Sequence, residues 1–196
     1  MILGLPLVNN IKNEKILEAA IKLLAEQGTA VPTAKIAQQA AVSNGTLFNY
    51  YPTKQALLDA VYLSIKKEVS THVINQVAEE TKHIKDLIFY LWQQYISWAM
   101  ANLLKQQVAS LLRGSFGISD EARASVDEIF SFINIKLEEA QNKQKIRDMP
   151  TAFLCEIAVA QMLATIQYAR MNDFTQLQLS QLIQQSFEVY WNGIKT

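Results

Sequence analysis

Apolar residues recur at three- and four-residue spacing along almost the whole chain, and this pattern predicts an all-α protein of about nine helices. The first helix is expected at residues 12–27 and ends at Gly28, a natural C-terminal stop. Two short helical patterns follow, on either side of a turn at residues 41–43. Thr53 is positioned to cap a fourth, long helix, which we expect to reach about Glu80.

The C-terminal part of the chain predicts five further helices. They are expected at residues 84–102, 103–112, 119–142, 150–171 and 173–193, with a loop at 114–117. The first of these helices is unusually rich in aromatic residues. Pro150 suits the start of the eighth helix, and residues 173–176 resemble a capping box at the start of the ninth. The eighth helix is apolar on every side, so it must be covered all round.

The two short helices and their turn form a helix-turn-helix pattern. Thr33 is expected to cap the first helix and Ser43 the second, each by accepting a hydrogen bond from a free backbone N–H group. Leu47 is the only large inward residue early in the second helix. Pro52 restricts the residue before it and ends that helix.

The outward positions of the second short helix carry an unusual set of side chains for a merely solvated surface. They hold no acidic residue, and they combine small, aromatic and amide side chains: Asn44, Gly45, Thr46, Phe48, Asn49 and Tyr50. Glycine lets a backbone approach phosphate closely, and asparagine can pair bidentately with adenine. This set favours the anionic groove of DNA. The same geometry also occurs in enzymes and bundles, where the glycine would be a helix fault and the aromatic residues would be partly buried.

Residues 12–69 resemble the N-terminal pattern of TetR-family transcriptional regulators, through KILEAAIKLLAEQG and TAKIAQQAAVSNGTLFNYYPTKQALLDAV. The resemblance implies a three-helix DNA-binding domain at 9–69, with its motif at about 32–51. A long helix would join it to an effector-binding and dimerisation domain at 70–196. The residues implied to face DNA are Thr33, Ser43, Asn44, Gly45, Thr46, Phe48, Asn49, Tyr50 and Lys54.

Within that set, Ser43, Tyr50 and Lys54 are expected to contact the DNA backbone, and Asn44, Thr46, Phe48 and Asn49 are expected to reach base edges.

Three positions depart from the usual pattern of the family. Ala41 stands where glycine is usual, so the turn must accept a Cβ atom. Phe48 stands where tyrosine is commonest, which removes a hydroxyl that could bond phosphate, although the ring could touch a thymine methyl group. Asn44 replaces what is frequently lysine, so the salt dependence of DNA binding should be shallower.

Composition adds weaker constraints. The 196 residues carry no net charge, but residues 9–69 hold seven lysines against four glutamates and one aspartate, a net charge of +2. Cys155 is the only cysteine, so an intrachain disulfide is excluded, and it is interpreted as a small buried apolar residue with a redox sensor as the minor alternative. Residues 1–10 lack the features of a signal sequence and are expected to be a flexible tail or arm. We expect a soluble cytoplasmic protein that does not enter the membrane.

The last two helices are expected to form a homodimer interface, because a single small domain cannot cover so much apolar surface. The resemblance implies the same contact. The alternative is ordinary packing within one chain. The predicted interface residues are Phe153, Ile157, Val159, Leu163, Leu179, Leu182, Ile183, Phe187, Tyr190 and Trp191.

A small-molecule effector is expected in the aromatic-rich C-terminal domain, although each aromatic residue taken alone is better explained as core. The candidate pocket residues are Phe89, Trp92, Tyr95, Ile96, Trp98, Met100, Phe116, Phe130, Met162, Ile166 and Tyr168, with Gln93, Gln94, Asn134 or Gln167 as orienting polar groups. This set favours an apolar or aromatic effector. His72 and His83 lack further ligands, so neither a metal site nor a cofactor is expected.

These observations predict a ligand-responsive, sequence-specific DNA-binding regulator, most simply a repressor that an effector releases from a palindromic operator. Two reading helices related by a dyad would address half-sites in neighbouring major grooves. No arrangement of residues typical of an enzyme is recognisable. The alternative is a helical dimeric protein-interaction module that does not bind DNA.

Overall fold

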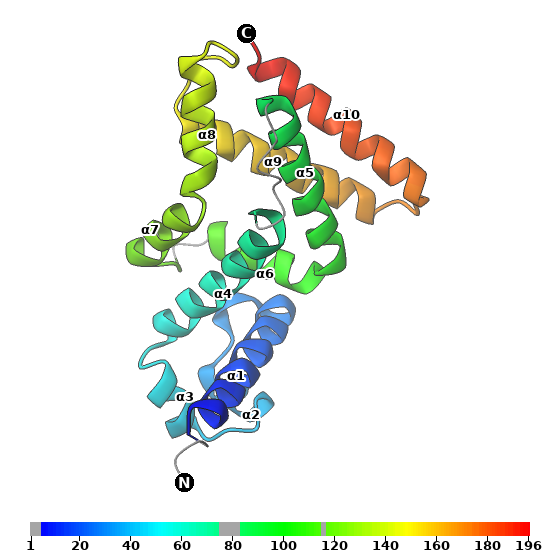
Figure 1. The fold of residues 1–196 in the computed structure, drawn as a ribbon. Helices are drawn as coiled ribbons and strands as arrows, with labels where there is room; N and C mark the ends of the chain where they lie inside the picture. The colour runs from blue at the N-terminus through cyan, green and yellow to red at the C-terminus, as the bar shows by residue number, and fades with distance from the viewer. Residues whose placement is uncertain (1–4, 75–82, 115–116) are drawn as a thin grey trace. The chain divides into compact units, whose positions relative to one another are not determined.

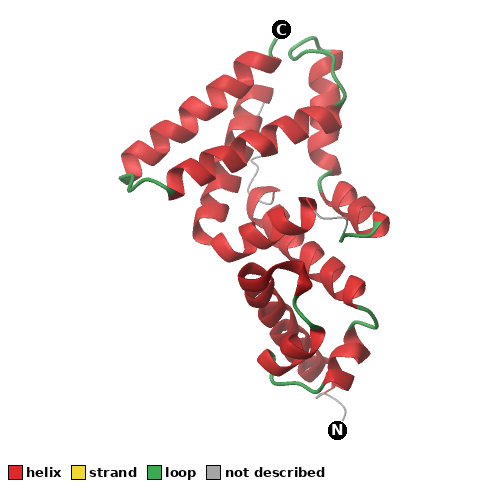
Figure 2. Cartoon of the chain, turned by 180° about the vertical axis from the view of Figure 1, so that it is seen from behind, coloured by secondary structure: helices red, strands yellow, loops and turns green. Residues whose placement is uncertain are grey.

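The computed structural model describes residues 5–74, 83–114 and 117–196. These residues form helices connected by turns and loops, and they contain no β-sheet (Figures 1 and 2). The helices are α1 (Leu5–Gln27), η1 (Gly28–Ala30), α2 (Thr33–Gln39), α3 (Asn44–Tyr50), α4 (Lys54–Ile74), α5 (Ile84–Ala101), α6 (Leu103–Gly114), α7 (Asp120–Ile129), α8 (Ser131–Asn142), α9 (Thr151–Arg170) and α10 (Gln176–Ile194). The expected all-α fold is confirmed.

The described part of the chain has ten α-helices where the sequence predicted about nine. The extra helix arises because the expected helix at 119–142 is broken at Phe130, which leaves the helical conformation with φ −103° and ψ 9°. At the N-terminus, α1 begins at Leu5, so residues 5–10 are helical and not the expected tail. The expected extension of the fourth helix to Glu80 lies outside the described residues.

The chain divides into two compact units, and the division differs from the expected domains 9–69 and 70–196. Unit 1 comprises Met1–Glu68 and Asn102–Asp127, and unit 2 comprises Val69–Ala101 and Glu128–Thr196. Helix α6 and most of α7 therefore pack with the N-terminal helices, although the sequence assigned them to the C-terminal domain. In unit 1, Gln107 Nε2 donates to Ala25 O at 3.0 Å, and Lys105 Nζ lies 2.6 Å from Glu68 Oε2.

The core of unit 1 holds the helix-turn-helix in place from one side. Ile16 and Leu24 of α1, Ile36 of α2, Leu47 of α3 and Leu57 of α4 are each at most 1% exposed. They come from four helices and follow the helical spacing that the sequence shows. Their burial leaves the opposite side of α3 to solvent.

The turn between α2 and α3 depends on Ala41, which has φ +54° and so lies in the left-handed region. Val42 N donates to Ala37 O at 3.0 Å, and Ala41 N donates to Gln38 O at 3.1 Å, which closes the end of α2. The turn therefore accepts the Cβ atom that the sequence placed there, at the energetic cost of a left-handed alanine.

We expect Ala41→Gly to raise the free energy of unfolding by about 0.5–1 kcal/mol, because relief of left-handed strain exceeds the added entropy of the unfolded chain. Ala40→Gly is the matched control: residue 40 has φ −78°, and the change should lower stability by about 0.5–1 kcal/mol. Urea denaturation of both variants checks this. Equal effects of the two changes would contradict it.

Unit 2 is built around α5, α9 and α10, with α8 against α9 (Figure 1). The ring of Trp92 on α5 lies 6.0 Å from that of Phe187 and 5.2 Å from that of Tyr190, both on α10. Trp92 Nε1 donates to Ser186 Oγ at 3.2 Å, and Thr165 Oγ1 lies 2.8 Å from the same hydroxyl oxygen. These bonds fix α5, α9 and α10 against one another.

The helix starts in unit 2 follow local signals with one shift. Pro150 directly precedes α9, as expected, but it makes no side-chain cap bond. The capping box of α10 is formed by Thr175 and Gln178, two residues later than the expected segment 173–176. Both segments offer a side chain with the required chemistry at the right spacing, so packing decides between them.

The hydroxyl group of Tyr190 links α10 to α9 by donating to Leu154 O at 3.1 Å. Burial, with a smaller contribution from Cys155, raises the pKa of Tyr190 above its usual value. A group whose pKa is higher in the folded state stabilises the fold fully below its unfolded pKa of about 10 and loses that contribution as the pH rises further.

Tyr190→Phe should therefore lower the free energy of unfolding by about 1 kcal/mol at pH 7, the value of one hydrogen bond. Its deficit relative to the wild type should shrink as the pH rises above about 10. Urea titrations at pH 7, 9 and 10.5 measure both effects. A deficit that stays constant over this range would show that Tyr190 does not titrate with unfolding.

Candidate nucleic-acid interface

Helix α3 presents one exposed face to solvent. Leu47 is fully buried, whereas Asn44, Gly45, Phe48 and Asn49 are exposed. These four residues are spaced i, i+1, i+4 and i+5, so they lie side by side on two successive turns. Of the residues expected to face DNA, these four and Ser43 are exposed, and the others are half-buried.

The start of α3 is capped as the sequence predicted. Ser43 Oγ accepts a hydrogen bond from Thr46 N at 3.0 Å, and it also lies 2.9 Å from Thr46 Oγ1. The hydroxyl of Thr46 is thus already engaged within the cap. Its methyl group is the part that stays available for a base.

Three further residues of the expected DNA-binding set lie at helix ends: one opens α2, one opens α4 and one closes α3. Thr33 is the first residue of α2, and Pro32 occupies the N-cap position without a side-chain cap bond, so the expected capping role of Thr33 is wrong. Lys54 opens α4, whose first turn is capped by Thr53 Oγ1 accepting from Ala56 N at 3.0 Å. Tyr50, at the last position of α3, is half-buried.

The C-terminal end of α3 is tied to α1. The hydroxyl of Tyr51, which is 8% exposed, donates to Asn13 Oδ1. Burial raises the pKa of Tyr51, the neighbouring Tyr50 raises it further, and the bond to Asn13 opposes both effects. Sequence reasoning missed this contact, because the two residues are 38 positions apart and each is unremarkable alone.

A second set of hydrogen bonds holds the start of α4, beside Lys54. Asp59 Oδ1 accepts from Ser119 N at 3.0 Å and from Gln55 Nε2 at 2.9 Å. Gln55 Nε2 also lies 2.6 Å from Gly117 O. The connection between α6 and α7 is thereby bound to α4 within unit 1. No pattern in the sequence indicates this contact, since only the fold brings residue 59 to residue 119.

The fold itself does not require glycine at position 45. Its φ is not in the left-handed region, and an added Cβ atom would meet only Ser43 Oγ, at an ordinary 3.8 Å. Glycine inside a helix nevertheless lowers stability by roughly 0.5–1 kcal/mol relative to alanine. The bare backbone on the exposed face of α3 is therefore a feature that the isolated protomer does not explain.

Helix α9 carries an exposed apolar stripe that faces away from its buried side. We call this the α9 stripe: the exposed Phe153, Ala160, Ala164 and Tyr168, the half-buried Ile157, and the exposed Met171, which directly follows the helix. Phe153, Tyr168 and Met171 are 51, 55 and 77% exposed, whereas Leu154, Met162 and Ile166 on the other side are buried. Leu177 and Val189 of α10 are also exposed, at 70 and 69%.

The expected dimer residues divide into two groups. Phe187 and Tyr190 are 0 and 4% exposed and belong to the interior of unit 2. These two residues are therefore removed from the expected dimer interface. Their apolar character serves the contact with Trp92 instead. The others are exposed or half-buried: Phe153, Ile157, Val159, Leu163, Leu179, Leu182, Ile183 and Trp191.

The expected pocket residues are not all brought together. Trp92, Ile96, Trp98, Met162 and Ile166 are buried, Tyr168 is exposed on the α9 stripe, and Phe116 lies outside the described residues. The rest are half-buried: Phe89, Tyr95, Met100 and Phe130. The ring of Phe89 lies 4.8 Å from that of Phe187, and the ring of Tyr168 lies 5.9 Å from that of Phe174. Much of the set is thus core packing.

Among the described buried side-chain atoms, His72 Nε2 on α4 and Tyr90 Oη on α5 have no hydrogen-bond partner. Both residues belong to unit 2. Buried polar atoms are rarely left unsatisfied, so each of them is a candidate contact for a bound molecule or water. The sequence did not single out Tyr90, because a tyrosine in an aromatic helix gives no sign of being unpaired.

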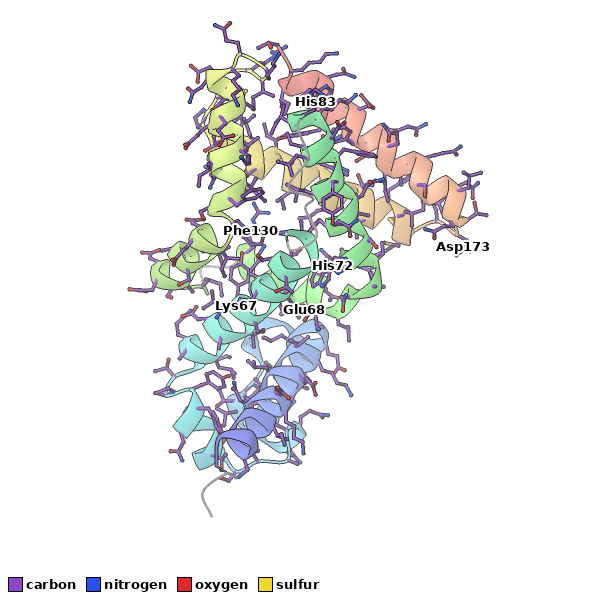
Figure 3. The ribbon with its side chains drawn as sticks, in the orientation of Figure 1. Lys67, Glu68, His72, His83, Phe130 and Asp173 are labelled. Atoms are coloured by element: carbon purple, nitrogen blue, oxygen red, sulfur yellow. The ribbon has the colours of Figure 1, made fainter. Side chains whose placement is uncertain are left out.

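Figure 3 shows His72 and His83 well apart in unit 2. Within the described ranges, no three side chains of His, Cys, Asp or Glu gather as metal ligands would. Cys155 is half-buried, less than the sequence suggested, and its Sγ lies 3.7 Å from Asn134 Oδ1. The expectation that no metal is bound stays a prediction.

One described helix, α9, is long and apolar enough to span a bilayer by length and composition. Only 28% of its most apolar window is buried within the protomer. A helix of this kind needs a covering surface, and length and composition alone do not say which.

Residues 16–61 match the family model described as "Bacterial regulatory proteins, tetR family". Among curated relatives, the nucleoid occlusion factor SlmA of Vibrio vulnificus (strain YJ016) is 25% identical over 183 residues, which cover 92% of each chain. A crystal structure of a tetR family transcription regulator from Shewanella sp. PV-4 has a TM-score of 0.86 and 28% identity, and covers 94% of this chain and 98% of that one. A second, from Marinobacter aquaeolei VT8, has a TM-score of 0.86, 18% identity and coverage of 97 and 99%.

Proposed function

We propose a specific task for this chain, which belongs to the TetR family of bacterial regulatory proteins: it is a cytoplasmic, homodimeric regulator that binds a palindromic operator. Its most direct action is repression, which a small apolar or aromatic effector relieves. The fold is that of a DNA-binding transcription regulator, and the family is one of regulators and not of enzymes.

The observation that carries this proposal is the exposed face of α3. It has no acidic side chain, it combines amide, aromatic and glycine positions, and it lies within the segment that matches the family. Ser43 caps the helix at one end, and the bond from Tyr51 to Asn13 fixes the other. A rigidly held reading helix is what base recognition in the major groove requires.

Dimerisation is supported by the α9 stripe. The stripe and the exposed apolar residues of α10 need a cover, and a second copy of the same two helices would supply one by two-fold symmetry. Two copies of α3 would then face half-sites about 34–36 Å apart. This arrangement gives the operator its expected two-fold symmetry.

An effector in unit 2 is supported by His72 and Tyr90. A hydrogen-bonding group of a ligand would satisfy either of these unpaired atoms, and the aromatic residues of α5 favour an apolar body. Such a ligand could prefer a form of the dimer in which the distance between the two α3 helices does not match the half-sites. It would then lower the affinity for DNA by the ratio of its affinities for that form and for the DNA-binding form.

Selection from random duplex DNA with the full chain tests the proposal, and a two-fold symmetric consensus is the expected result. The double variant Asn49→Ala with Lys54→Ala should lose retention of that duplex while its thermal unfolding stays cooperative. The matched control, Asn142→Ala with Lys143→Ala, removes the same side chains from an exposed site in unit 2 and should bind normally. Enrichment without symmetry, or no enrichment, contradicts the proposal.

A second candidate follows from the relatives named nucleoid occlusion factor. Their match extends over 92% of the chain and so includes unit 2 as well as the helix-turn-helix. Under this candidate the DNA-bound dimer acts on cell division and not on transcription. Deletion of the gene would then misplace division sites relative to the nucleoid. A change in transcripts next to the enriched sites, with normal division, favours the regulator.

The same selection distinguishes this regulator from the alternative, a helical dimeric protein-interaction module that does not bind DNA. Such a module would enrich no duplex.

A further inference from the structure

We propose that Phe48 reads sequence by contacting the C5 methyl group of a thymine in each half-site, an inference that rests on the DNA-binding function proposed above. Its ring is 41% exposed on α3, whereas the adjacent Leu47 is fully buried. In α3 it is the only exposed large apolar side chain. It therefore adds an apolar contact to a face that otherwise offers amide groups and backbone.

Single exposed apolar residues are common on protein surfaces, so exposure alone does not identify a contact. The position of Phe48 does. It lies next to Asn49, and it follows Asn44 and Gly45 by one helical turn, so the ring is at the centre of the exposed face. A phenyl ring at this place either stays in water when DNA binds or is covered by a base.

Gly45 leaves room beside the ring. Side chains on a helix lean toward its N-terminus, so Phe48 leans toward the turn that contains residue 45. Among the described residues, the atom nearest to the place of the missing Cβ atom is Ser43 Oγ, at an ordinary 3.8 Å. The exposed face of α3 therefore carries a phenyl ring at residue 48 and bare backbone one turn earlier at residue 45.

The chemistry of the major groove determines which base can cover the exposed ring of Phe48. Thymine is the base that presents a methyl group there, on its C5 atom, whereas the C5 atom of cytosine carries only a hydrogen. Phenylalanine has no hydroxyl and cannot bond a phosphate. Asn49 beside it can pair with an adenine. The expected half-site thus holds a thymine next to a base pair that contains adenine.

Uracil tests the inference, because it differs from thymine only by the methyl group. In the selected duplex, each thymine is replaced in turn by uracil, symmetrically in both half-sites. At one position we expect the wild-type affinity to fall by about fourfold per half-site, the value of one buried methyl group, and by about 15-fold for both. Phe48→Ala should bind the two duplexes with equal affinity.

Two further variants separate the methyl contact from other effects. Phe48→Tyr keeps the ring and should keep the preference for thymine over uracil. Asn49→Ala should lower affinity for both duplexes and leave the ratio unchanged. Phe48 is exposed, so these variants should unfold at the wild-type temperature.

Three results would overturn the inference. Acceptance of uracil at every position by the wild type, or an unchanged thymine preference in Phe48→Ala, shows that the ring does not contact a methyl group. Both leave the proposed DNA-binding function intact, because the selected duplex is still bound. If no symmetric duplex is selected at all, the DNA-binding function fails and this inference with it.

Discussion

The double variant Ala160→Glu with Ala164→Glu is expected to be a folded monomer whose affinity for the palindromic duplex is lower by roughly a hundredfold or more, the advantage of linking two binding sites. Both alanines are exposed and lie in the α9 stripe. Glutamate is nearly as good a helix former as alanine, so the change should leave the protomer stable. Four glutamates facing one another across a two-fold axis would repel and stay hydrated, which opposes association.

Analytical ultracentrifugation and a DNA-binding titration measure the two parts of this result. The matched control is Ala101→Glu with Ala124→Glu, which makes the same chemical change at two exposed helical alanines outside the stripe. It should remain dimeric and bind normally. A dimeric Ala160→Glu, Ala164→Glu variant would show that the subunits associate through another surface.

Gly45→Ala is expected to stabilise the protein and weaken its binding to DNA. The stability gain should be about 0.5–1 kcal/mol, the usual difference between alanine and glycine in a helix. No steric penalty opposes the gain, since the added methyl would make only an ordinary contact with Ser43 Oγ. At the DNA surface the same methyl would separate α3 from the duplex, and we expect a loss of about tenfold, the effect of roughly 1.4 kcal/mol.

Gly193→Ala is the control for that pair of effects. Residue 193 is an exposed glycine in α10, and a Cβ atom there would meet nothing within 4 Å. This variant should not lose stability, and its DNA affinity should equal that of the wild type. If Gly45→Ala also binds DNA normally, the bare backbone of α3 has no role in close approach.

Local signals in the sequence were reliable where one short segment decides the outcome. The caps by Ser43 and Thr53 need only a side chain three residues before a free N–H group, and both bonds form. Thr33 and Asp173 offered the same chemistry, but Pro32 and Thr175 hold the cap positions. Several neighbouring residues can start a helix, so the packing of its far end selects the start.

Apolar patterns were less informative about what covers a residue. Helices α9 and α10 are apolar in the sequence, and a dimer interface and an intrachain core predict the same pattern. The fold assigns Phe187 and Tyr190 to the interior beside Trp92, and it leaves Phe153 and Tyr168 in solvent. The break at Phe130 was likewise invisible, because neither glycine nor proline marks it.

The sequence by itself determined the helical class, the position of α3 within the helix-turn-helix and the identity of its exposed side chains. These depend on residues within one or two turns of each other, where spacing alone fixes which side chains share a face. The tertiary structure decided the rest. It brought Tyr51 to Asn13 and Asp59 to Ser119, and it placed α6 with the N-terminal helices, because contacts between distant segments depend on the complete packing and leave no periodic trace in the chain.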